Sequence, residues 1–200
     1  NSGAIDVYGY TWAAGIEAQG ADSVSVTNSG DITVTASGFY QGYVYSYLYQ
    51  AGGVFAYTPG GDAFGIYATA GEGGATVGNS GNIEVQGGYV TGVEVQSGGD
   101  IAVTNSGDIV AGSGLTIDQV YYYDPIQAVY VYYNGTQVAT GINATSNGEG
   151  AHVAVSNSGD ITADAIFGAT GIAATSGGYG GTASVENSGD IAVSQYNNAG

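Results

Sequence analysis

The sequence predicts an all-β protein: a parallel β-helix, or β-solenoid, of about seven coils with three strands in each coil. Two observations support this prediction. A nine-residue motif with a tight polar centre recurs along the chain, and a glycine followed by an apolar residue precedes most copies of it. The residues around both landmarks alternate between apolar and polar, which is the period of a half-buried strand. Residues 1–200 are therefore expected to form a single solenoid, with the right-handed winding usual for parallel crossovers.

The recurring motif reads apolar-x-Asn-Ser-Gly-Asp/Asn-Ile-x-apolar, and Val26–Val34 is a complete copy. Asn and Gly tolerate the left-handed backbone of a sharp corner, so each copy predicts a strand, a tight corner and a second strand. The asparagines of successive coils are expected to stack as a ladder with a structural role. A Tyr-rich segment separates Asn28 from Asn79, so the ladder is expected to be broken there. The corner asparagines of the complete copies are Asn28, Asn79, Asn105, Asn157 and Asn187.

Two units, residues 42–64 and 119–140, lack the Asn-Ser-Gly corner and carry tyrosines instead. They are interpreted as atypical Tyr-rich coils. Hairpins that protrude from one corner of the solenoid are the alternative, because Asn134-Gly135 is a favourable hairpin turn.

The order of long and Tyr-rich units also predicts an internal duplication. In this reading, residues 15–91 match residues 92–170. Coil-to-coil pairing of such units would satisfy the backbone hydrogen bonds of each buried strand.

The alternation within each unit predicts which side chains point into the solenoid. Glu17, Ser25 and Thr33 are expected to point outward. The inward positions of the first unit should be repeated upward as apolar stacks. They are Ile16, Ala18, Val24, Val26, Ile32 and Val34.

The pattern Gly-Ile-x-Ala followed by Ala-x-Val-x-Asn-Ser-Gly-Asp-Ile-x-Val resembles the β-strand-repeat passenger regions of bacterial autotransporter-like surface and secreted proteins. The resemblance covers the long units and leaves out the Tyr-rich ones. It implies a β-helical architecture and an extracellular or bacterial cell-surface location. It is less specific for activity, since such passengers include adhesins, filament-like stalks and enzymes.

The charge composition excludes two classes of partner. The chain has 17 acidic residues and no Lys or Arg, for a formal net charge of −17. Nucleic acid and anionic membrane surfaces both require basic residues, so neither is an expected partner. No apolar run approaches the ~20 residues of a spanning helix, so no membrane insertion of this segment is expected.

The sequence also argues against an enzyme. His152 is the only histidine, it lies in an alternating strand pattern, and the chain has no Cys. The nucleophilic and metal-assisted mechanisms that depend on such residues are therefore not expected. A glycosidase needs only a pair of carboxylates and remains the alternative.

Aligned acids offer the one candidate for a metal. Asp160 and Asp190 occupy the same motif position in consecutive copies, so their like charges should lie one coil apart. We expect solvent to screen the repulsion between these charges, and a calcium ion that bridges the two carboxylates is the alternative. No other cofactor is expected.

The tyrosines are the unusual feature of the chain. Strand periodicity places Tyr43, Tyr45, Tyr47 and Tyr49 on one face, and Tyr57, Tyr130 and Tyr132 repeat this pattern. The tyrosines are expected either to pack on one another across strands or to form an aromatic surface. Such a surface would contact glycans or a second rod.

The function predicted from these features is structural and non-catalytic: an extracellular stalk, adhesin passenger or fibre segment. Its expected partner is itself, through end-to-end coil stacking or through the Tyr-rich units. The two ends of the sequence are expected to fall at matching points of the repeated unit, so that stacked copies would pair three open strand edges. The alternative is a β-helix that binds or processes carbohydrate through surface Tyr, Asp and Glu.

Overall fold

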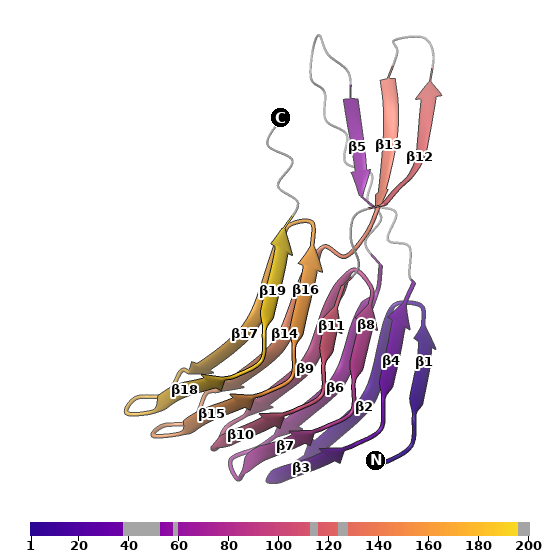
Figure 1. The fold of residues 1–200 in the computed structure, drawn as a ribbon. Helices are drawn as coiled ribbons and strands as arrows, with labels where there is room; N and C mark the ends of the chain where they lie inside the picture. Colours follow the sequence, from indigo (N-terminus) through magenta and orange to yellow (C-terminus); the bar gives the residue numbers. More distant parts are fainter. Residues whose placement is uncertain (38–52, 58–59, 113–115, 124–127, 196–200) are drawn as a thin grey trace.

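The computed structural model describes residues 1–37, 53–57, 60–112, 116–123 and 128–195. Three parallel sheets wind into a solenoid, and the chain passes in turn through sheet B, sheet C and sheet A (Figure 1). Sheet A contains β1 (Ile5–Gly9), β4 (Ile32–Ala36), β8 (Ile83–Gln86), β11 (Ile109–Ala111), β16 (Ile161–Ala165) and β19 (Ile191–Gln195). Sheet B contains β2 (Trp12–Gly20), β6 (Asp62–Ala70), β9 (Tyr89–Ser97), β14 (Val138–Ser146) and β17 (Gly168–Ser176). Sheet C contains β3 (Ser23–Asn28), β7 (Gly74–Asn79), β10 (Ile101–Asn105), β15 (His152–Asn157) and β18 (Thr182–Asn187).

The predicted fold class, a parallel β-helix with three strands in each coil, is confirmed. The described residues form five complete coils, β2-β3-β4, β6-β7-β8, β9-β10-β11, β14-β15-β16 and β17-β18-β19, preceded by β1. This is fewer than the predicted seven, because the strands of the Tyr-rich units pair elsewhere. The described part of the chain contains no helix that is long and apolar enough to cross a membrane.

The Tyr-rich strands form a separate sheet D, with β12 (Thr116–Tyr123), β13 (Ala128–Asn134) and β5 (Gly53–Tyr57) in that order. β12 and β13 are antiparallel, and β13 and β5 are parallel. These strands are therefore not coils, and the antiparallel pair is closer to the hairpin alternative. Asn134 is the last residue of β13, so Asn134-Gly135 does not join β12 to β13. Strand alternation alone cannot separate the two arrangements, since it is the same in either pairing. The internal duplication stays a prediction.

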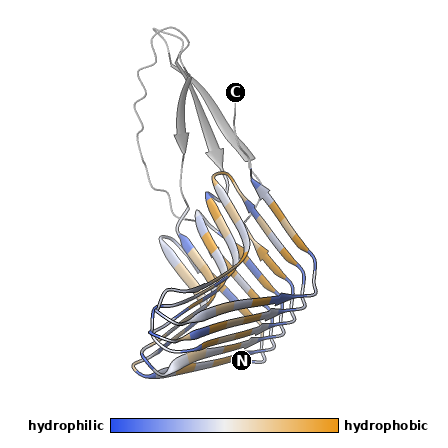
Figure 2. Ribbon diagram, turned by 90° about the vertical axis from the view of Figure 1, so that its left-hand side faces the viewer, coloured by the Kyte–Doolittle hydropathy of each residue, from blue (hydrophilic) through white to orange (hydrophobic). Residues whose placement is uncertain are grey.

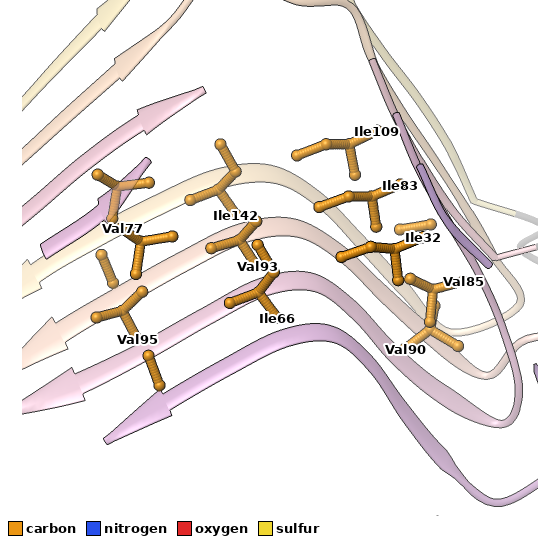
Figure 3. Close-up of a cluster of buried hydrophobic side chains, with 14 of the residues drawn as sticks. Ile32, Ile66, Val77, Ile83, Val85, Val90, Val93, Val95, Ile109 and Ile142 are labelled. Carbon is orange, nitrogen blue, oxygen red and sulfur yellow. The ribbon is translucent and has the colours of Figure 1, made fainter. Parts of the chain in front are cut away.

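The core consists of apolar columns that run through the coils (Figure 3). Ile32, Ile83 and Ile109 lie one above another in sheet A, with partners fixed by the parallel register. The predicted inward positions are confirmed: Val26, Ile32 and Val34 are buried, and the remaining three pack against the core. Those three, Ile16, Ala18 and Val24, are only partly buried because their strands have a neighbour on one side alone. Hydrophobic and hydrophilic residues alternate along the strands, as Figure 2 shows.

The glycine landmark has a packing role in sheet B. A Cβ added at Gly92 would overlap Ile109 Cγ2 and would lie 2.6 Å from the carbonyl oxygen of Gly141 in the next coil. The same position in neighbouring coils is occupied by Gly65 and Gly141. Glycine is needed here because the strands bring backbone and core side chains too close for any side chain.

The two ends of the described solenoid are out of phase. β1 and β19 both belong to sheet A, so that sheet has six described strands, whereas sheets B and C have five each. No described contact tests the prediction that stacked copies pair three open edges, and it stays a prediction.

Candidate functional site: the Asn-Ser-Gly corner and the outer faces

The corner asparagines form a buried ladder of amide groups. Asn79 Nδ2 donates to Asn105 Oδ1 at 2.7 Å, and Asn157 Nδ2 donates to Asn187 Oδ1 at 2.7 Å. These are the two stacked pairs that the sequence predicts. The side chains of Asn28, Asn79, Asn105 and Asn157 are nearly inaccessible to solvent. Burial of an amide requires that its hydrogen bonds be made within the protein, and the ladder makes them.

The ladder continues across both insertions, so the predicted break is wrong. Asn28 Nδ2 donates to Asn79 Oδ1 at 2.8 Å, although the two residues are 51 positions apart. Asn105 Nδ2 donates to Asn157 Oδ1 at 2.7 Å across 52 positions. The reason is that the strands of the Tyr-rich units pair in sheet D, which lets the next corner stack directly on the previous one. The ladder also includes Asn1, whose Nδ2 donates to Asn28 Oδ1 at 2.9 Å.

Each corner amide also closes its own turn. Asn105 Nδ2 donates to the Gly107 carbonyl oxygen at 2.7 Å, and Asn28 Nδ2 donates to Gly30 in the same way at 2.7 Å. One side chain therefore satisfies a backbone group of its corner and connects two coils. This double use explains why Asn occupies the position in each complete copy of the motif.

The aligned acids form a second ladder, in which the carboxylates of Asp31, Asp108 and Asp160 each accept a hydrogen bond from the backbone N–H of the next corner. The Asp190 N–H donates to Asp160 Oδ1 at 2.9 Å, and the Asp160 N–H donates to Asp108 Oδ1 at 3.0 Å. The partial positive charge of each backbone N–H offsets part of the like-charge repulsion along the column. Asn82 replaces one acid of the column and receives the Asp108 N–H at 3.1 Å. Among the described residues, no three His, Cys, Asp or Glu side chains gather into a metal-binding group.

His152 lies on the outer face of sheet C, in an open depression of about 510 Å³. Its Nδ1 lies 2.7 Å from Thr182 Oγ1, and its backbone N–H donates to Asp100 Oδ1 at 2.8 Å. Ser, Thr, Ala and Gly residues make up most of the lining, and Asp100 is the only acid in it. The pair of carboxylates that a glycosidase needs is not found in this depression.

The outer face of sheet B carries a buried carboxylate that the sequence pattern does not predict. Glu94 has only 5% of its surface exposed, although alternation places it outward. Asn143 Nδ2 donates to both carboxylate oxygens at 3.0 Å, and Gln96 Nε2 donates to Oε1 at 2.9 Å. Burial raises the pKa of Glu94, and the hydrogen bonds from Gln96 and Asn143 offset part of this effect. Asn143 is 49 residues away, so only the coil register reveals the pair.

Aromatic side chains gather on the outer face of sheet B in the first coils. The ring centroids of Trp12 and Phe64 are 6.2 Å apart, and those of Phe64 and Tyr67 are 5.0 Å apart. Trp12 and Tyr89 are exposed and lie on either side of Asp62 in the register of the sheet.

The predicted tyrosine surface lies outside what the structure describes. Tyr43, Tyr45, Tyr47 and Tyr49 fall outside the described residues. Tyr57, Tyr130 and Tyr132 lie on β5 and β13, where the backbone alone is described. The prediction of a tyrosine contact surface is therefore untested.

Comparison with protein-family models, with curated proteins and with solved structures finds no match for this chain. The resemblance to autotransporter-like passenger regions gains no support from these comparisons and stays a prediction.

Proposed function

We propose that this chain is a non-catalytic structural rod: an extracellular or cell-surface stalk, adhesin passenger or fibre segment. The observation that carries the proposal is the continuity of the stack. The amide ladder runs from Asn1 to Asn187 without interruption, and the apolar columns run beside it. A continuous core with satisfied corners suits a molecule that holds its length. The described outer faces are mostly small and polar, as a spacer requires.

Coil-on-coil stacking would extend the rod at the β17-β18-β19 edge. Val193 is 47% exposed at this edge, whereas Ala163, its partner one coil earlier, is fully buried. Val185 and Ile191 are exposed in the same way. Burying these side chains under another coil is favourable by about 25 cal/mol for each Å² of apolar surface. The net charge of −17 opposes contact between copies, so association should strengthen as salt screens the charge.

Sedimentation velocity at low and high ionic strength tests the proposal, with electron microscopy of the high-salt sample. We expect larger species and rods in high salt. Val193→Asn should weaken association, because it places an amide on the apolar edge. Ala192→Asn is the matched control, since Ala192 lies on the same strand and faces outward. A wild-type protein that stays monomeric at every salt concentration would rule out stacking.

The second candidate is a carbohydrate-binding surface, which the aromatic group on sheet B favours. Exposed Trp12 and Tyr89 flank the Asp62 carboxylate, and sugars stack on aromatic faces while their hydroxyls bind carboxylates. Co-sedimentation with insoluble polysaccharides tests this candidate. Trp12→Ala should reduce binding, whereas Tyr179→Ala, an exposed aromatic in a turn, should not. Equal binding by the two variants would rule the surface out.

A further inference from the structure

We propose that Asn147-Gly148 is a site of spontaneous covalent modification, at which the asparagine deamidates to aspartate and isoaspartate. The pair lies at the corner between β14 and β15, and the same corner of the coils on either side joins β9 to β10 and β17 to β18. The asparagines of the ladder are shielded from the reaction by their hydrogen bonds. This inference goes beyond the proposed structural function and does not depend on it.

The reaction needs only an asparagine, the residue that follows it and water. The backbone nitrogen of the following residue loses its proton and attacks the carbonyl carbon of the side-chain amide. The bond from that carbon to the amide nitrogen breaks, ammonia leaves, and a succinimide ring remains. Water then opens the ring at one of its two carbonyl groups, which gives aspartate or isoaspartate. A following glycine favours the attack, because it has no Cβ to hinder the nitrogen and its backbone is permissive.

The side-chain amide of Asn147 is open to attack. Asn147 is exposed, and the described residues make no hydrogen bond to its amide group. Asn105 differs, because its side chain is only 1% exposed and its Nδ2 donates to the Gly107 carbonyl oxygen and to Asn157 Oδ1. Rotation of the amide toward the backbone is therefore unrestrained at Asn147, whereas at Asn105 it breaks these bonds.

The attacking nitrogen differs between the two kinds of corner in the same way. The Gly148 N–H makes a long contact of 3.4 Å with the Ser146 hydroxyl oxygen. In the ladder, the corresponding N–H of Ser106 donates to the Asn79 carbonyl oxygen of the neighbouring coil at 2.8 Å. The N–H groups that follow the other described ladder asparagines make the same coil-to-coil bond, and they belong to Ser80, Ser158 and Ser188. The fold therefore restrains both reacting groups in the ladder and neither of them at this corner.

The isoaspartate product does not fit the stacked corner. It lengthens the main chain by one methylene group, and neighbouring coils leave no space for one. A Cβ added at Gly148 would overlap the Gly98 carbonyl oxygen, and a Cβ added at Gly178 would overlap the Gly148 carbonyl oxygen. Both products also place a new negative charge next to Glu149, in a chain whose net charge is already −17. We therefore expect modified molecules to be less stable than unmodified ones.

Peptide mapping by mass spectrometry after incubation at mildly alkaline pH tests the proposal. Deamidation changes the mass of a peptide, and chromatography separates its aspartate and isoaspartate forms. Incubation of native and of urea-unfolded protein separates the effect of the fold from that of the local sequence. We expect Asn147 to convert at similar rates in the two samples. Asn105 should convert on the order of a hundredfold more slowly in the native protein, because the three hydrogen bonds of its side chain must open first.

Asn147→Gly is the matched control, since glycine occupies the same position in the coils on either side, as Gly98 and Gly177. The variant should fold as the wild type does. After equal incubation, the wild type should lose Tm as the modified peptide accumulates, whereas the Tm of Asn147→Gly should not change. An equal loss of Tm in both proteins would contradict the expected effect on the corner. Native protein in which Asn147 converts as slowly as Asn105, or far more slowly than in urea, would overturn the proposal.

Discussion

Removal of one amide from the middle of the ladder should destabilise the solenoid far more than removal of the last amide. Asn105 makes three hydrogen bonds through its side chain: it accepts from Asn79 Nδ2 and donates to the Gly107 carbonyl oxygen and to Asn157 Oδ1. Asn105→Ala removes all three and leaves the Asn157 Oδ1 atom without its ladder donor. At about 1 kcal/mol for each net bond, the free energy of unfolding should fall by about 3 kcal/mol.

The last member of the ladder is the matched control. Asn187 accepts from Asn157 Nδ2 and donates to the Gly189 carbonyl oxygen, but its side chain is exposed, so water can replace the lost partners. Asn187→Ala should therefore cost about 1 kcal/mol or less. Asn105→Asp should be worse than Asn105→Ala, because it removes the donor and buries a charge.

Urea unfolding followed by circular dichroism measures these differences. An unchanged dependence of the free energy on urea in each variant would show that the same cooperative unit unfolds. Equal losses for Asn105→Ala and Asn187→Ala would refute the reasoning, since the ladder would then contribute nothing beyond a local turn.

Three further predictions concern other parts of the rod. Gly92→Ala should lower the free energy of unfolding by about 1–3 kcal/mol in thermal or urea unfolding, because the new Cβ overlaps the core. The control Gly78→Ala places its Cβ in open space and should be neutral or stabilising, so equal effects of the two variants would contradict the packing. Because burial raises the pKa of Glu94, its contribution favours folding at acid pH and is lost as the pH rises through that pKa. The free energy of unfolding of Glu94→Gln should therefore improve relative to wild type from acid to neutral pH, and a difference between the two proteins that stays constant with pH would contradict this. We expect a chelator to leave the Tm unchanged, because Asp160 Oδ1 already accepts the Asp190 N–H; a Tm that falls with chelator and recovers with calcium would establish a calcium bridge.

The local pattern was enough to predict the fold class and the inward residues. Ile32 and Val34 alternate with outward polar residues, and a half-buried strand is the structure that satisfies this alternation. The stacked corner of Asn79 on Asn105 could be predicted because the two residues are separated by one regular unit.

Features that depend on register between distant segments could not be predicted. The break expected between Asn28 and Asn79 was inferred from their separation in sequence, but stacking depends on which strands enter the sheets. The predicted number of coils was too high for the same reason, because the Tyr-rich strands pair in sheet D and not in the coils. Glu94 looked exposed by alternation, and its burial comes from neighbours in adjacent coils, of which Asn143 lies 49 residues away. A carboxylate with one amide two residues along its strand (Gln96) and another at the matching position of the next coil (Asn143) is the signal that could have revealed it.

At the corner between sheet A and sheet B, short and long connections lead to the same strand register. β8 is joined to β9 by Gly87 and Gly88 alone, whereas the chain between β4 and β6 spans residues 37–61 and still returns to the same register. The strands on either side of this corner are held by their neighbours above and below, so the length and sequence of the connection do not enter their pairing. Segments could therefore be exchanged, lengthened or diversified at this corner while the supporting rod stays the same. Surface variety and mechanical support can change independently in such a molecule.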